Sequence, residues 1–534
     1  MGVKILLLSI FCSSVLYAQP INERYQLGVQ NTIFGSVIVL DSGYIVAGLN
    51  GMGTAFGWKG FFTKFDLNGD TLKMNEVSSD TMGFDFAFHT DLIRIKTNKF
   101  ALLATLIMPN RQWGFQVNII DSSATIELNS NIFNITDNTF YFVNRSVALL
   151  ESNLDDSYTG LMSVANESSL TTNILLVNIS NTGVLNWFKI IPAPNPNEFR
   201  LLIPRSIVQK SNGNYIIGGF IFKTSGPPNE ERAHIRILEV DTIGNVIHTF
   251  TDTTHPMDLG GEGLTLTVDG DLIFGRLRGF WDTQYNGWSS NAQIVCLDSI
   301  YQEKWVIEYG DSLNIPAEYN EILPIENNEF VAVGTIYNLT GKAGSLMKFN
   351  EEGEVLWNRS YIKIPRLSNP NIVYGNHELY DVERTPDSGF VMVGEARNFA
   401  NPNEPMGQLG WLVKTDKHGC LVPGCEEFDN PSPIDTSTVE PIDTVITPKP
   451  TPAPKIIVYP NPVQNELNIY FASESLALNA TAALYSSNGQ IVNQWPIANN
   501  FITYILDVSD LASGVYILKI INGAEVATQK VVVE

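Results

Sequence analysis

Acidic side chains recur at one position of a repeated sequence pattern, and they are the residues best suited to acid–base chemistry in this chain. Asp91, Glu321 and Asp381 each stand nine residues before an aromatic residue that opens an apolar run, and Glu318 and Glu378 stand three residues further upstream in the last two copies. Two nearby carboxylates with different pKa values can act as acid and base on a glycosidic bond. Such a group can also hold a calcium ion. The plainer interpretation is that these are solvated loop carboxylates that cap backbone amides.

A second set of residues combines aromatic rings with arginines in the longer loops between the apolar runs. Exposed Trp and Tyr beside Arg suit a glycan or a protein partner, because the rings stack and the guanidinium group forms planar hydrogen bonds. The alternative is that these rings pack the loops against the rim of the fold. The residues predicted to bind a ligand are Trp58, Arg111, Trp113, Arg276, Arg278, Trp281, Tyr285, Trp288 and Arg397.

Well-known catalytic and metal-binding motifs are missing from the sequence. His377-Glu378 lacks the second histidine of the HExxH motif, no GxSxG motif is present, and the six histidines have no ligand-like spacing. We therefore predict no metal site and no cofactor, with calcium at the acidic group as the alternative. We expect a non-catalytic module that binds a glycan or a protein. The rival functions are a glycoside hydrolase or lyase that uses the acidic group, and a structural component of a surface assembly.

These residues belong to a unit of about sixty residues that repeats seven times. Copies read DSGYIVAG at 41–48, SNGNYIIGG at 211–219 and DSGFVMVG at 387–394. The residues that open the apolar runs are separated by 56, 61, 54, 57, 58 and 60 positions. Self-similarity at a fixed period is the mark of a repeat architecture. The opening residues are Tyr44, Phe100, Leu161, Tyr215, Leu272, Phe330 and Phe390.

Each unit predicts four short strands joined by a tight turn, a long loop and a second tight turn. The second strand is apolar at consecutive positions, so it needs cover on both faces, which neighbouring units around a central axis can supply. We therefore predict an all-β protein with a seven-bladed β-propeller over residues 19–425. The segment Tyr25–Gln30 is expected to add the last strand and close the ring. The acidic group is expected at the start of the innermost strands, on the face that carries the long loops.

Two further features of the unit lead to structural predictions. Small residues that end the second strand, such as Gly48, Gly334 and Gly394, are expected to let neighbouring sheets approach closely. An Asp, Asn or Ser at the second tight turn is expected to accept hydrogen bonds from the backbone of the turn. These turn residues are Asp66, Asp121, Ser180, Asp241, Asp298, Asn350 and Asp416.

Composition narrows the choice of partner. The chain has 534 residues, of which 44% are hydrophobic and 17% are charged, and its net charge is −23. An acidic chain argues against binding to nucleic acid or to an anionic membrane, because both repel negative charge.

The N-terminus predicts export. Lys4 is followed by the apolar run 5–16, which is typical of a secretory signal peptide, assigned here to residues 1–18. No other segment has eighteen consecutive apolar residues, so no transmembrane segment is expected. Export permits disulfides, and Cys420 and Cys425 are predicted to form one, although such a pair can also provide half of a metal site. Cys296 lies in an apolar run and is expected to be a buried thiol.

Two different segments follow the repeats. Residues 426–454 contain seven prolines and almost no core-forming residues, which predicts an extended linker. Residues 455–534 read as about seven short alternating strands, with a hairpin signal at Asn488-Gly489, which predicts a small Ig-like β-sandwich.

The same segment begins with Tyr459-Pro460-Asn461-Pro462, continues with LYSSNGQ at 484–490 and with Leu511, Gly514 and Tyr516, and ends on Lys530-Val531-Val532-Val533. With this ordered set it resembles the type A C-terminal sorting domain of the bacterial type IX secretion system. The resemblance implies that an outer-membrane translocon is the partner of this domain. It also implies that the domain is removed and that the cargo is released or anchored at the cell surface. The protein is therefore expected to be secreted or located on the outer-membrane surface. The residues expected to form the sorting signal are Pro460, Asn461, Pro462, Gly489, Gly514, Tyr516 and Lys530.

Overall fold

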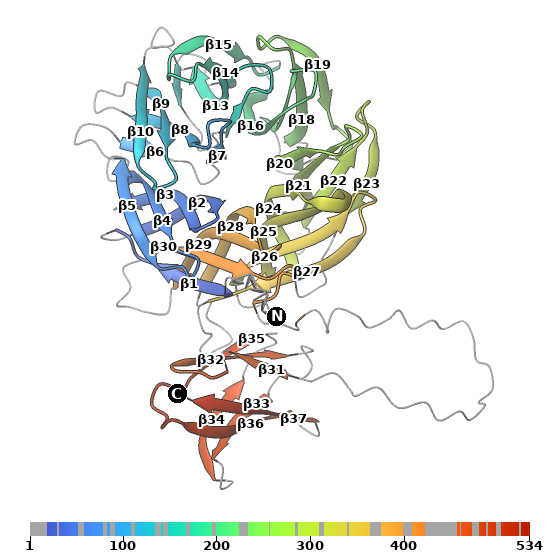
Figure 1. The fold of residues 1–534 in the computed structure, drawn as a ribbon. Helices are drawn as coiled ribbons and strands as arrows, with labels where there is room; N and C mark the ends of the chain where they lie inside the picture. The colour runs from blue at the N-terminus through green and yellow to red at the C-terminus, as the bar shows by residue number, and fades with distance from the viewer. Residues whose placement is uncertain are drawn as a thin grey trace, which may run out of the picture.

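The computed structural model is an all-β protein in which groups of strands form a ring, with a smaller two-sheet domain beside it (Figure 1). It describes residues 19–425 and 456–533. Within these ranges the following residues are not described: 29–30, 52–57, 78–82, 86–90, 108–112, 134–139, 143–147, 167–170, 195–198, 224–232, 256, 283–286, 309–313, 339–340, 364–374, 399–407, 422–424, 460, 472–479, 487–489, 498–502 and 523–524. The predicted signal peptide and linker therefore lie outside the described residues.

The first group of strands shows the arrangement that the others repeat. Four antiparallel strands follow each other in sequence order, and the first lies nearest the centre of the ring while the fourth lies at its rim (Figure 1). The second strand is buried along almost its whole length, as expected for a strand with sheets on both sides. The four strands are β2 (Asn31–Leu40), β3 (Gly43–Gly51), β4 (Trp58–Phe65) and β5 (Thr71–Val77).

Further groups continue around the ring in chain order. The next contains β6 (Gly83–Asp85), β7 (Ile93–Arg94), β8 (Phe100–Ile107), β9 (Trp113–Ile120) and β10 (Ile126–Phe133). It is followed by β11 (Phe140–Phe142), β12 (Ala148–Glu151), β13 (Tyr158–Asn166), β14 (Thr172–Ile179) and β15 (Leu185–Ile191). In both groups the innermost strand is divided into two short pieces that pair with the same second strand.

The second half of the ring has longer inner strands. One group contains β16 (Phe199–Gln209), β17 (Tyr215–Lys223), β18 (Ala233–Val240) and β19 (Val246–Thr251). The next contains β20 (Met257–Leu266), β21 (Leu272–Asp282), β22 (Gly287–Leu297) and β23 (Glu303–Ile307). Another contains β24 (Asn314–Pro324), the 3₁₀ turn η1 (Glu326–Asn328), β25 (Glu329–Asn338), β26 (Gly341–Asn350) and β27 (Val355–Tyr361). The last contains β28 (Gly375–Arg384), β29 (Phe390–Asn398) and β30 (Gln408–Thr415).

The N-terminal strand completes the last group and closes the ring. β1 (Ile21–Tyr25) pairs antiparallel with β30, from Ile21 opposite Lys414 to Tyr25 opposite Gly410. The prediction that Tyr25–Gln30 forms this strand was therefore wrong by one strand length. The pairing uses the earlier segment because Ile21 is buried in the core and the side chain of Asn22 accepts a hydrogen bond from Trp411.

Hydrophobic clusters join each group of strands to its neighbour. The cluster at the closure contains Phe34 and Phe61 of the first group together with Val391, Val393 and Leu412 of the last. Equivalent clusters lie between the other successive groups. The core is therefore distributed around the ring between sheets, which is the packing that consecutive apolar positions in the second strands require.

The second tight turns use the hydrogen bonds that the sequence predicted. Asp66 accepts the backbone N–H groups of Asn68 and Asp70 at 2.9 Å through one carboxylate oxygen. The prediction is confirmed in the other copies, in which the turn residue accepts one or two backbone N–H groups.

A β-bulge recurs in the inner strands, and it explains the small residues of the second strands. The pairing shifts between Tyr319 and Glu321 and again between Leu379 and Asp381. The residue opposite the latter bulge is Gly394, where a Cβ atom would overlap the carbonyl oxygen of Glu378. The expectation that these glycines let neighbouring sheets approach was wrong at this position, because the close contact is with the bulged strand of the same sheet.

The C-terminal domain contains two sheets that enclose one core. One sheet has the order β31-β32-β35 and the other β34-β33-β36-β37. Asn461 fixes the start of the domain to its last strand, because its amide donates to the carbonyl of Lys530 and its oxygen accepts the N–H of Val532. The strands are β31 (Ile456–Tyr459), β32 (Glu466–Phe471), β33 (Ala480–Ser486), β34 (Ile491–Ile497), β35 (Thr503–Asp507), β36 (Gly514–Asn522) and β37 (Glu525–Val533).

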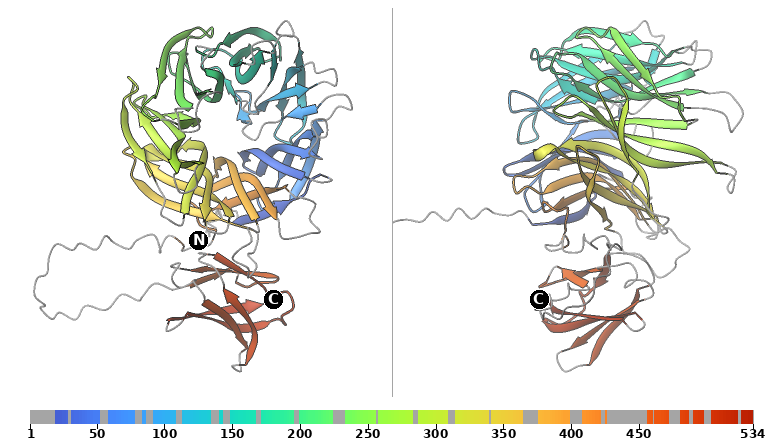
Figure 2. Two further views of the ribbon diagram at one scale, coloured as in Figure 1. Left: turned by 180° about the vertical axis from the view of Figure 1, so that it is seen from behind. Right: turned by 90° about the vertical axis from the view of Figure 1, so that its right-hand side faces the viewer.

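The two-sheet domain lies beside the ring and leaves its central opening uncovered in the views of Figures 1 and 2. Lys363 forms ion pairs with Glu23 of β1 at 3.2 Å and with Glu466 of β32 at 3.4 Å. Cys420 and Cys425 form a disulfide, and Cys296 is a buried free thiol. The described residues contain no helix with the length and hydrophobicity needed to cross a lipid bilayer.

Candidate functional site

The acidic residues singled out from the sequence lie on the innermost strands of three groups. Asp91 directly precedes β7, Glu321 lies in β24 and Asp381 lies in β28. Glu321 and Asp381 directly follow the bulges, in the second half of their strands. They therefore lie toward the tight turns that join the first and second strands, and the expectation that they start these strands on the long-loop face was wrong. The inner strands begin at Asn314 and Gly375, seven and six residues before these carboxylates, and the bulge adds only one residue to that distance.

Electrostatic coupling shows that these carboxylates share one environment. Burial, followed by the charge of Asp381, raises the pKa of Asp91 to about 8. Burial also holds the pKa of Glu321 well above its ordinary value, with added repulsion from Asp91 and Asp381. Residues more than two hundred positions apart in the chain therefore act on one another at the centre of the ring. The arrangement favours protonated carboxyl groups at neutral pH.

Asp381 also has a structural function that joins the last group of strands to the first. Its Oδ2 atom accepts the hydroxyl of Ser36 at 2.6 Å and the N–H of Val37 at 2.8 Å. The hydroxyl of Ser36 in turn accepts the N–H of Leu92 in the next group at 3.0 Å. This position of the unit thus connects successive groups. The contact with a backbone amide agrees with the capping interpretation, but Asp381 lies desolvated in β28 and not in a solvated loop. Burial raises the pKa of Asp381, while these hydrogen bonds oppose the shift.

A pocket of about 390 Å³ opens on the tight-turn face beside this group of carboxylates. Glu383 lines it, and burial followed by repulsion from Asp381 raises the pKa of Glu383 to about 7. Arg94 lines the same pocket and opposes that shift, and its guanidinium donates to the carbonyl of Val39 at 2.7 Å. The pocket is lined by Val39, Leu40, Asp41, Arg94, Glu326, Glu383, Arg384, Thr385, Pro386 and Ser388.

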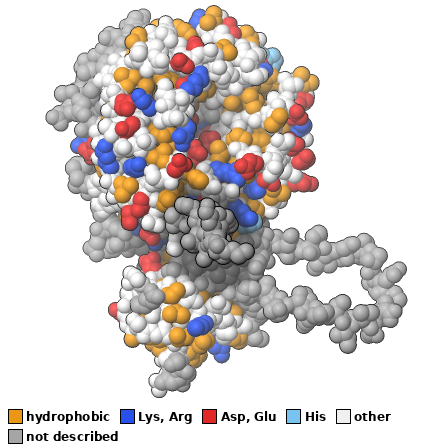
Figure 3. All heavy atoms as spheres, viewed as in Figure 1, with side chains coloured by type: hydrophobic (Ala, Val, Ile, Leu, Met, Phe, Trp, Pro, Cys, Tyr) orange, Lys and Arg blue, Asp and Glu red, His pale blue; other side chains and the backbone are white. Residues whose placement is uncertain are grey.

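Charged residues of both signs continue along the inner strands. Burial, with repulsion from Glu262, raises the pKa of Glu318 to about 7. Glu378 pairs with Lys342 at 2.7 Å and accepts the hydroxyl of Tyr380 at 3.0 Å. Seen as in Figure 1, the surface is hollowed near the centre of the ring, with acidic and basic side chains interspersed around the hollow (Figure 3). Such a surface offers both donors and acceptors to a polar ligand.

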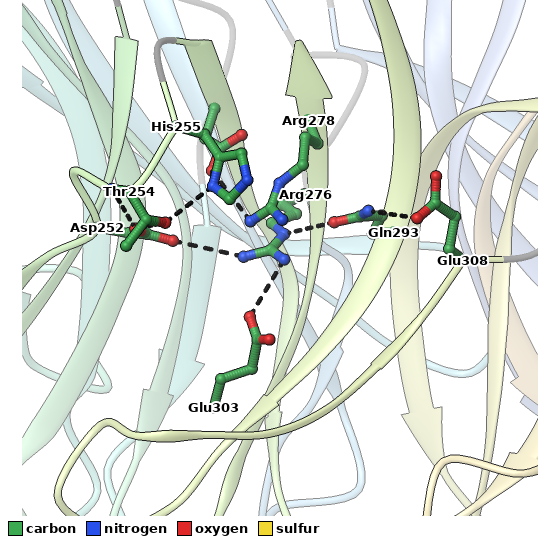
Figure 4. A network of polar contacts seen from close by, with 9 residues as sticks. Asp252, Thr254, His255, Arg276, Arg278, Gln293, Glu303 and Glu308 are labelled. Atoms are coloured by element: carbon green, nitrogen blue, oxygen red, sulfur yellow. Dashed lines mark hydrogen bonds and ion pairs between the residues drawn. The ribbon is translucent and has the colours of Figure 1, made fainter. Parts of the chain in front are cut away.

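The arginines predicted to bind a ligand already have partners within the fold. Arg276 is buried in β21 and donates to Gln293 at 2.8 Å and to Glu303 at 3.2 Å (Figure 4). Arg278 lies 3.5 Å from Asp258, and Arg397 forms an ion pair with Glu395. Arg111 and Tyr285 lie outside the described residues, as do the side chains of Trp58, Trp113, Trp281 and Trp288.

Sequence reasoning missed Arg94 and Glu383, although both lie in the repeated unit. The available signal was their position next to the acidic residues, because Glu383 stands two residues after Asp381 and Arg94 three residues after Asp91. Side chains two residues apart on a strand point to the same face. Among the described residues, one group has three possible metal ligands close together, and it lies elsewhere, at Asp252, His255 and Asp258.

Comparison with known proteins identifies the C-terminal domain. Residues 457–534 match the family described as the secretion system C-terminal sorting domain. The match confirms the type IX sorting interpretation, so the chain is exported by type IX secretion to the cell surface or beyond it. No curated protein matches the chain.

Solved structures with a similar arrangement include several propellers and polysaccharide-degrading enzymes. An ulvan lyase of polysaccharide lyase family PL25 is 7% identical, with 74% of this chain and 97% of that chain covered and a TM-score of 0.47. The propeller domain of the Trilobed protease from Pyrococcus furiosus is 9% identical over 73% and 98%, with a TM-score of 0.34. An α-L-arabinanase from Penicillium chrysogenum is 12% identical over 64% and 99%, with a TM-score of 0.37. At this level of similarity they carry no argument about function.

Proposed function

We propose that this chain is an exported glycan-binding protein, built from a signal peptide (residues 1–18), a seven-bladed β-propeller (19–425), a linker (426–454) and an Ig-like sorting domain (455–534). The strand groups and the clusters between them, including the cluster between the last and first groups, support a closed propeller. Binding without turnover remains the preferred function because the sequence has no established catalytic motif.

The observation that carries the proposal is the pocket lined by Glu383 and Arg94, beside the buried carboxylates of the inner strands. Its volume of about 390 Å³ is that of a site for a small molecule or for one or two sugar units. A protein partner needs a surface of roughly 1,000 Å² or more, which a recess of this size does not provide. Carboxylates accept hydrogen bonds from sugar hydroxyls, and Arg94 and Arg384 supply donors.

The aromatic loops extend this proposal to the opposite face. Trp281 and Trp288 lie on β21 and β22, directly opposite each other in the pairing of these strands. Indole rings stack on the apolar faces of sugar rings, so two tryptophans at paired positions would give a glycan a separate binding contact on that face. We propose them as binding residues on this basis, together with Trp58, Arg111, Trp113 and Tyr285.

A glycan array probed with the mature chain tests the proposal. Hits are measured again by isothermal titration calorimetry with Glu383→Gln, which removes the charge and keeps the shape of the side chain. We expect binding to weaken by about tenfold or more, because a hydrogen bond to a charged group contributes about 1.5–3 kcal/mol. Glu352→Gln makes the same change at an exposed tight turn between β26 and β27 and is expected to bind as wild type. An array without hits, or equal glycan affinities for Glu383→Gln and the wild type, would contradict the proposal.

One observation favours a second function, that of a glycoside hydrolase or lyase. Asp91, Glu321 and Asp381 are coupled carboxyl groups with raised pKa values, and a carboxyl group that stays protonated at neutral pH can serve as a general acid. The array hits are therefore assayed for new reducing ends and for unsaturated products. Turnover that Glu321→Gln and Asp381→Asn abolish would establish this function in place of simple binding.

A further inference from the structure

The loop between β19 and β20 and the start of β20 bring three potential metal ligands together, away from the residues that line the proposed glycan pocket. Asp252, His255 and Asp258 each offer one ligand atom, and these atoms all lie within 4.8 Å of one another. Nδ1 of His255 and Oδ2 of Asp258 are 3.9 Å apart. Figure 4 shows Asp252 and His255 on one side of this network and the two arginines of β21 on the other.

Asp258 carries a buried carboxylate whose charge is poorly compensated by its neighbours. Its side chain is 0% exposed, and its Oδ1 atom has no hydrogen-bond partner among the described residues. Its Oδ2 atom accepts a long hydrogen bond from Arg278 at 3.5 Å and lies 3.9 Å from Nδ1 of His255. A buried carboxylate without close partners costs several kcal/mol, and a native fold normally satisfies it with a hydrogen bond, a water molecule or an ion.

The neighbouring arginines meet this need only in part: Arg278 reaches Oδ2 of Asp258 at 3.5 Å, and the shorter contacts of Arg276 lie elsewhere. Arg276 donates to Gln293 at 2.8 Å and to Glu303 at 3.2 Å, whereas its contact with Asp252 is 3.5 Å long. Gln293 donates in turn to Glu308 at 3.0 Å. The network thus holds four carboxylates, those of Asp252, Asp258, Glu303 and Glu308, against the two guanidinium groups of Arg276 and Arg278. With His255 neutral, the cluster has a net charge of −2, which one divalent cation neutralises.

We propose that Asp252, His255 and Asp258 bind a divalent transition-metal ion of the zinc class. Two carboxylate oxygens and one imidazole nitrogen are ligands that Zn²⁺ accepts, whereas Ca²⁺ and Mg²⁺ prefer oxygen alone. A tetrahedral Zn²⁺ ion places two ligands, each at about 2.0–2.1 Å, about 3.4 Å apart, so the observed 3.9 Å has to shorten by about half an ångström when the ion binds. The remaining ligand atom needs only a small shift of the loop.

The surroundings support a site that solvent or a ligand can reach. The side chain of His255 is 37% exposed and that of Asp252 is 13% exposed, so three protein ligands leave a coordination position facing outward. The hydroxyl of Thr254 donates to Asp252 at 2.5 Å and lies 2.8 Å from Nδ1 of His255, and a metal bound at Nδ1 would replace this second contact. The ion would join the loop to β20 and would compensate the buried charge of Asp258.

Metal content and affinity of the mature chain test this proposal. The chain is purified with a tag that lacks histidine, stripped with a chelator and reloaded with Zn²⁺. Bound metal is measured by inductively coupled plasma mass spectrometry, and affinity by competition with a chromophoric chelator. We expect one ion per chain, and His255→Ala and Asp258→Asn are expected to weaken binding about 100-fold or more, since even residues that only support a ligand contribute 10–100-fold.

Two controls keep the test decisive. His248→Ala removes another exposed histidine, on β19 of the same sheet, and is expected to retain the ion. Circular dichroism melts show whether each variant folds; if Asp258→Asn does not fold, the exposed residue His255 still gives a result. Loading with Co²⁺ is expected to give a visible absorption band that His255→Ala lacks. Less than one-tenth of an equivalent of bound Zn²⁺, or equal affinity in His255→Ala, would overturn the proposal.

Discussion

Replacing Asp91 by asparagine is expected to flatten the dependence of the ring's stability on pH. Burial and the charge of Asp381 raise the pKa of Asp91 to about 8, whereas in the unfolded chain this carboxyl group has an ordinary pKa near 4. The folded state therefore keeps a proton that the unfolded state loses. The stabilisation is fully present below pH 4 and is lost as the pH rises toward 8.

The size of the effect follows from the shift. One proton held only in the folded state changes the free energy of unfolding by about 1.4 kcal/mol per pH unit. Between pH 5 and pH 8, Asp91 alone accounts for a loss of up to about 3–4 kcal/mol. Glu318, Glu383 and Glu395, whose pKa values burial raises to about 7, add to the slope of the wild type. The variant should therefore show a reduced slope that does not reach zero.

Urea unfolding at pH 5, 6, 7 and 8, followed by tryptophan fluorescence, measures this slope for the two chains. Asp269→Asn provides a matched control, because Asp269 is exposed in the turn between β20 and β21. We expect the control to follow the wild type and Asp91→Asn to lose less stability on going to pH 8. If Asp91→Asn and the wild type show the same pH dependence, Asp91 does not lie in a shared, desolvated group of carboxylates and the reasoning fails.

Three other predictions test the fold and the pocket. Gly394→Ala should destabilise the ring by about 2–4 kcal/mol in urea unfolding, because the added Cβ would overlap the carbonyl of Glu378. The control Gly270→Ala has open space around the new Cβ but a φ of +87°, so it should cost only about 1 kcal/mol. Equal effects of the two variants would contradict the bulge explanation. Deleting residues 19–25 should expose the edge of β30 and produce oligomers in size-exclusion chromatography, and a stable monomer would argue against closure by β1. Glycan affinity should rise from pH 6 to pH 8 as Glu383 ionises and becomes a better acceptor, and Glu383→Gln should remove that rise; an unchanged pH profile would exclude Glu383 from the contact.

The repeated unit made the arrangement of strands predictable. The apolar runs recur at a near-constant interval, which shows the repeat directly. The turn residues, such as Asp66 and Asp416, form local hydrogen bonds that each copy makes by itself. The closing strand was predicted in the right region but at the wrong residues, because its register depends on Ile21 and Asn22 meeting β30 across the ring. Such contacts between distant segments leave no local pattern.

The acidic group was predictable in its members but not in its position. Asp91, Glu321 and Asp381 share a place in the unit, which the sequence shows, but the inner strands begin seven and six residues before Glu321 and Asp381, so these two lie in the second half of their strands. The sequence also presented Arg276 as a candidate for ligand binding. Its burial depends on Gln293 and Glu303, which lie on the two following strands.

The three potential metal ligands were missed for a related reason. Asp252, His255 and Asp258 follow each other at intervals of three, the first two in a loop and the third in β20, and this spacing matches no familiar metal motif. What distinguishes them is the complete burial of Asp258 without a close partner, and only the fold shows this.

A double-mutant cycle between Asp91 and Glu321 tests most directly whether carboxylates from separate strand groups meet at the centre of the ring. Asp91→Asn, Glu321→Gln and the double variant are compared with the wild type by urea unfolding at pH 9, above the pKa of about 8 of Asp91, where repulsion between ionised carboxylates is stronger than at neutral pH. The two side chains are 230 positions apart in the chain, so coupling between them requires the ring. We expect a non-additive term of about 1 kcal/mol or more. Additive effects, with a term within about 0.3 kcal/mol of zero, would contradict the shared site.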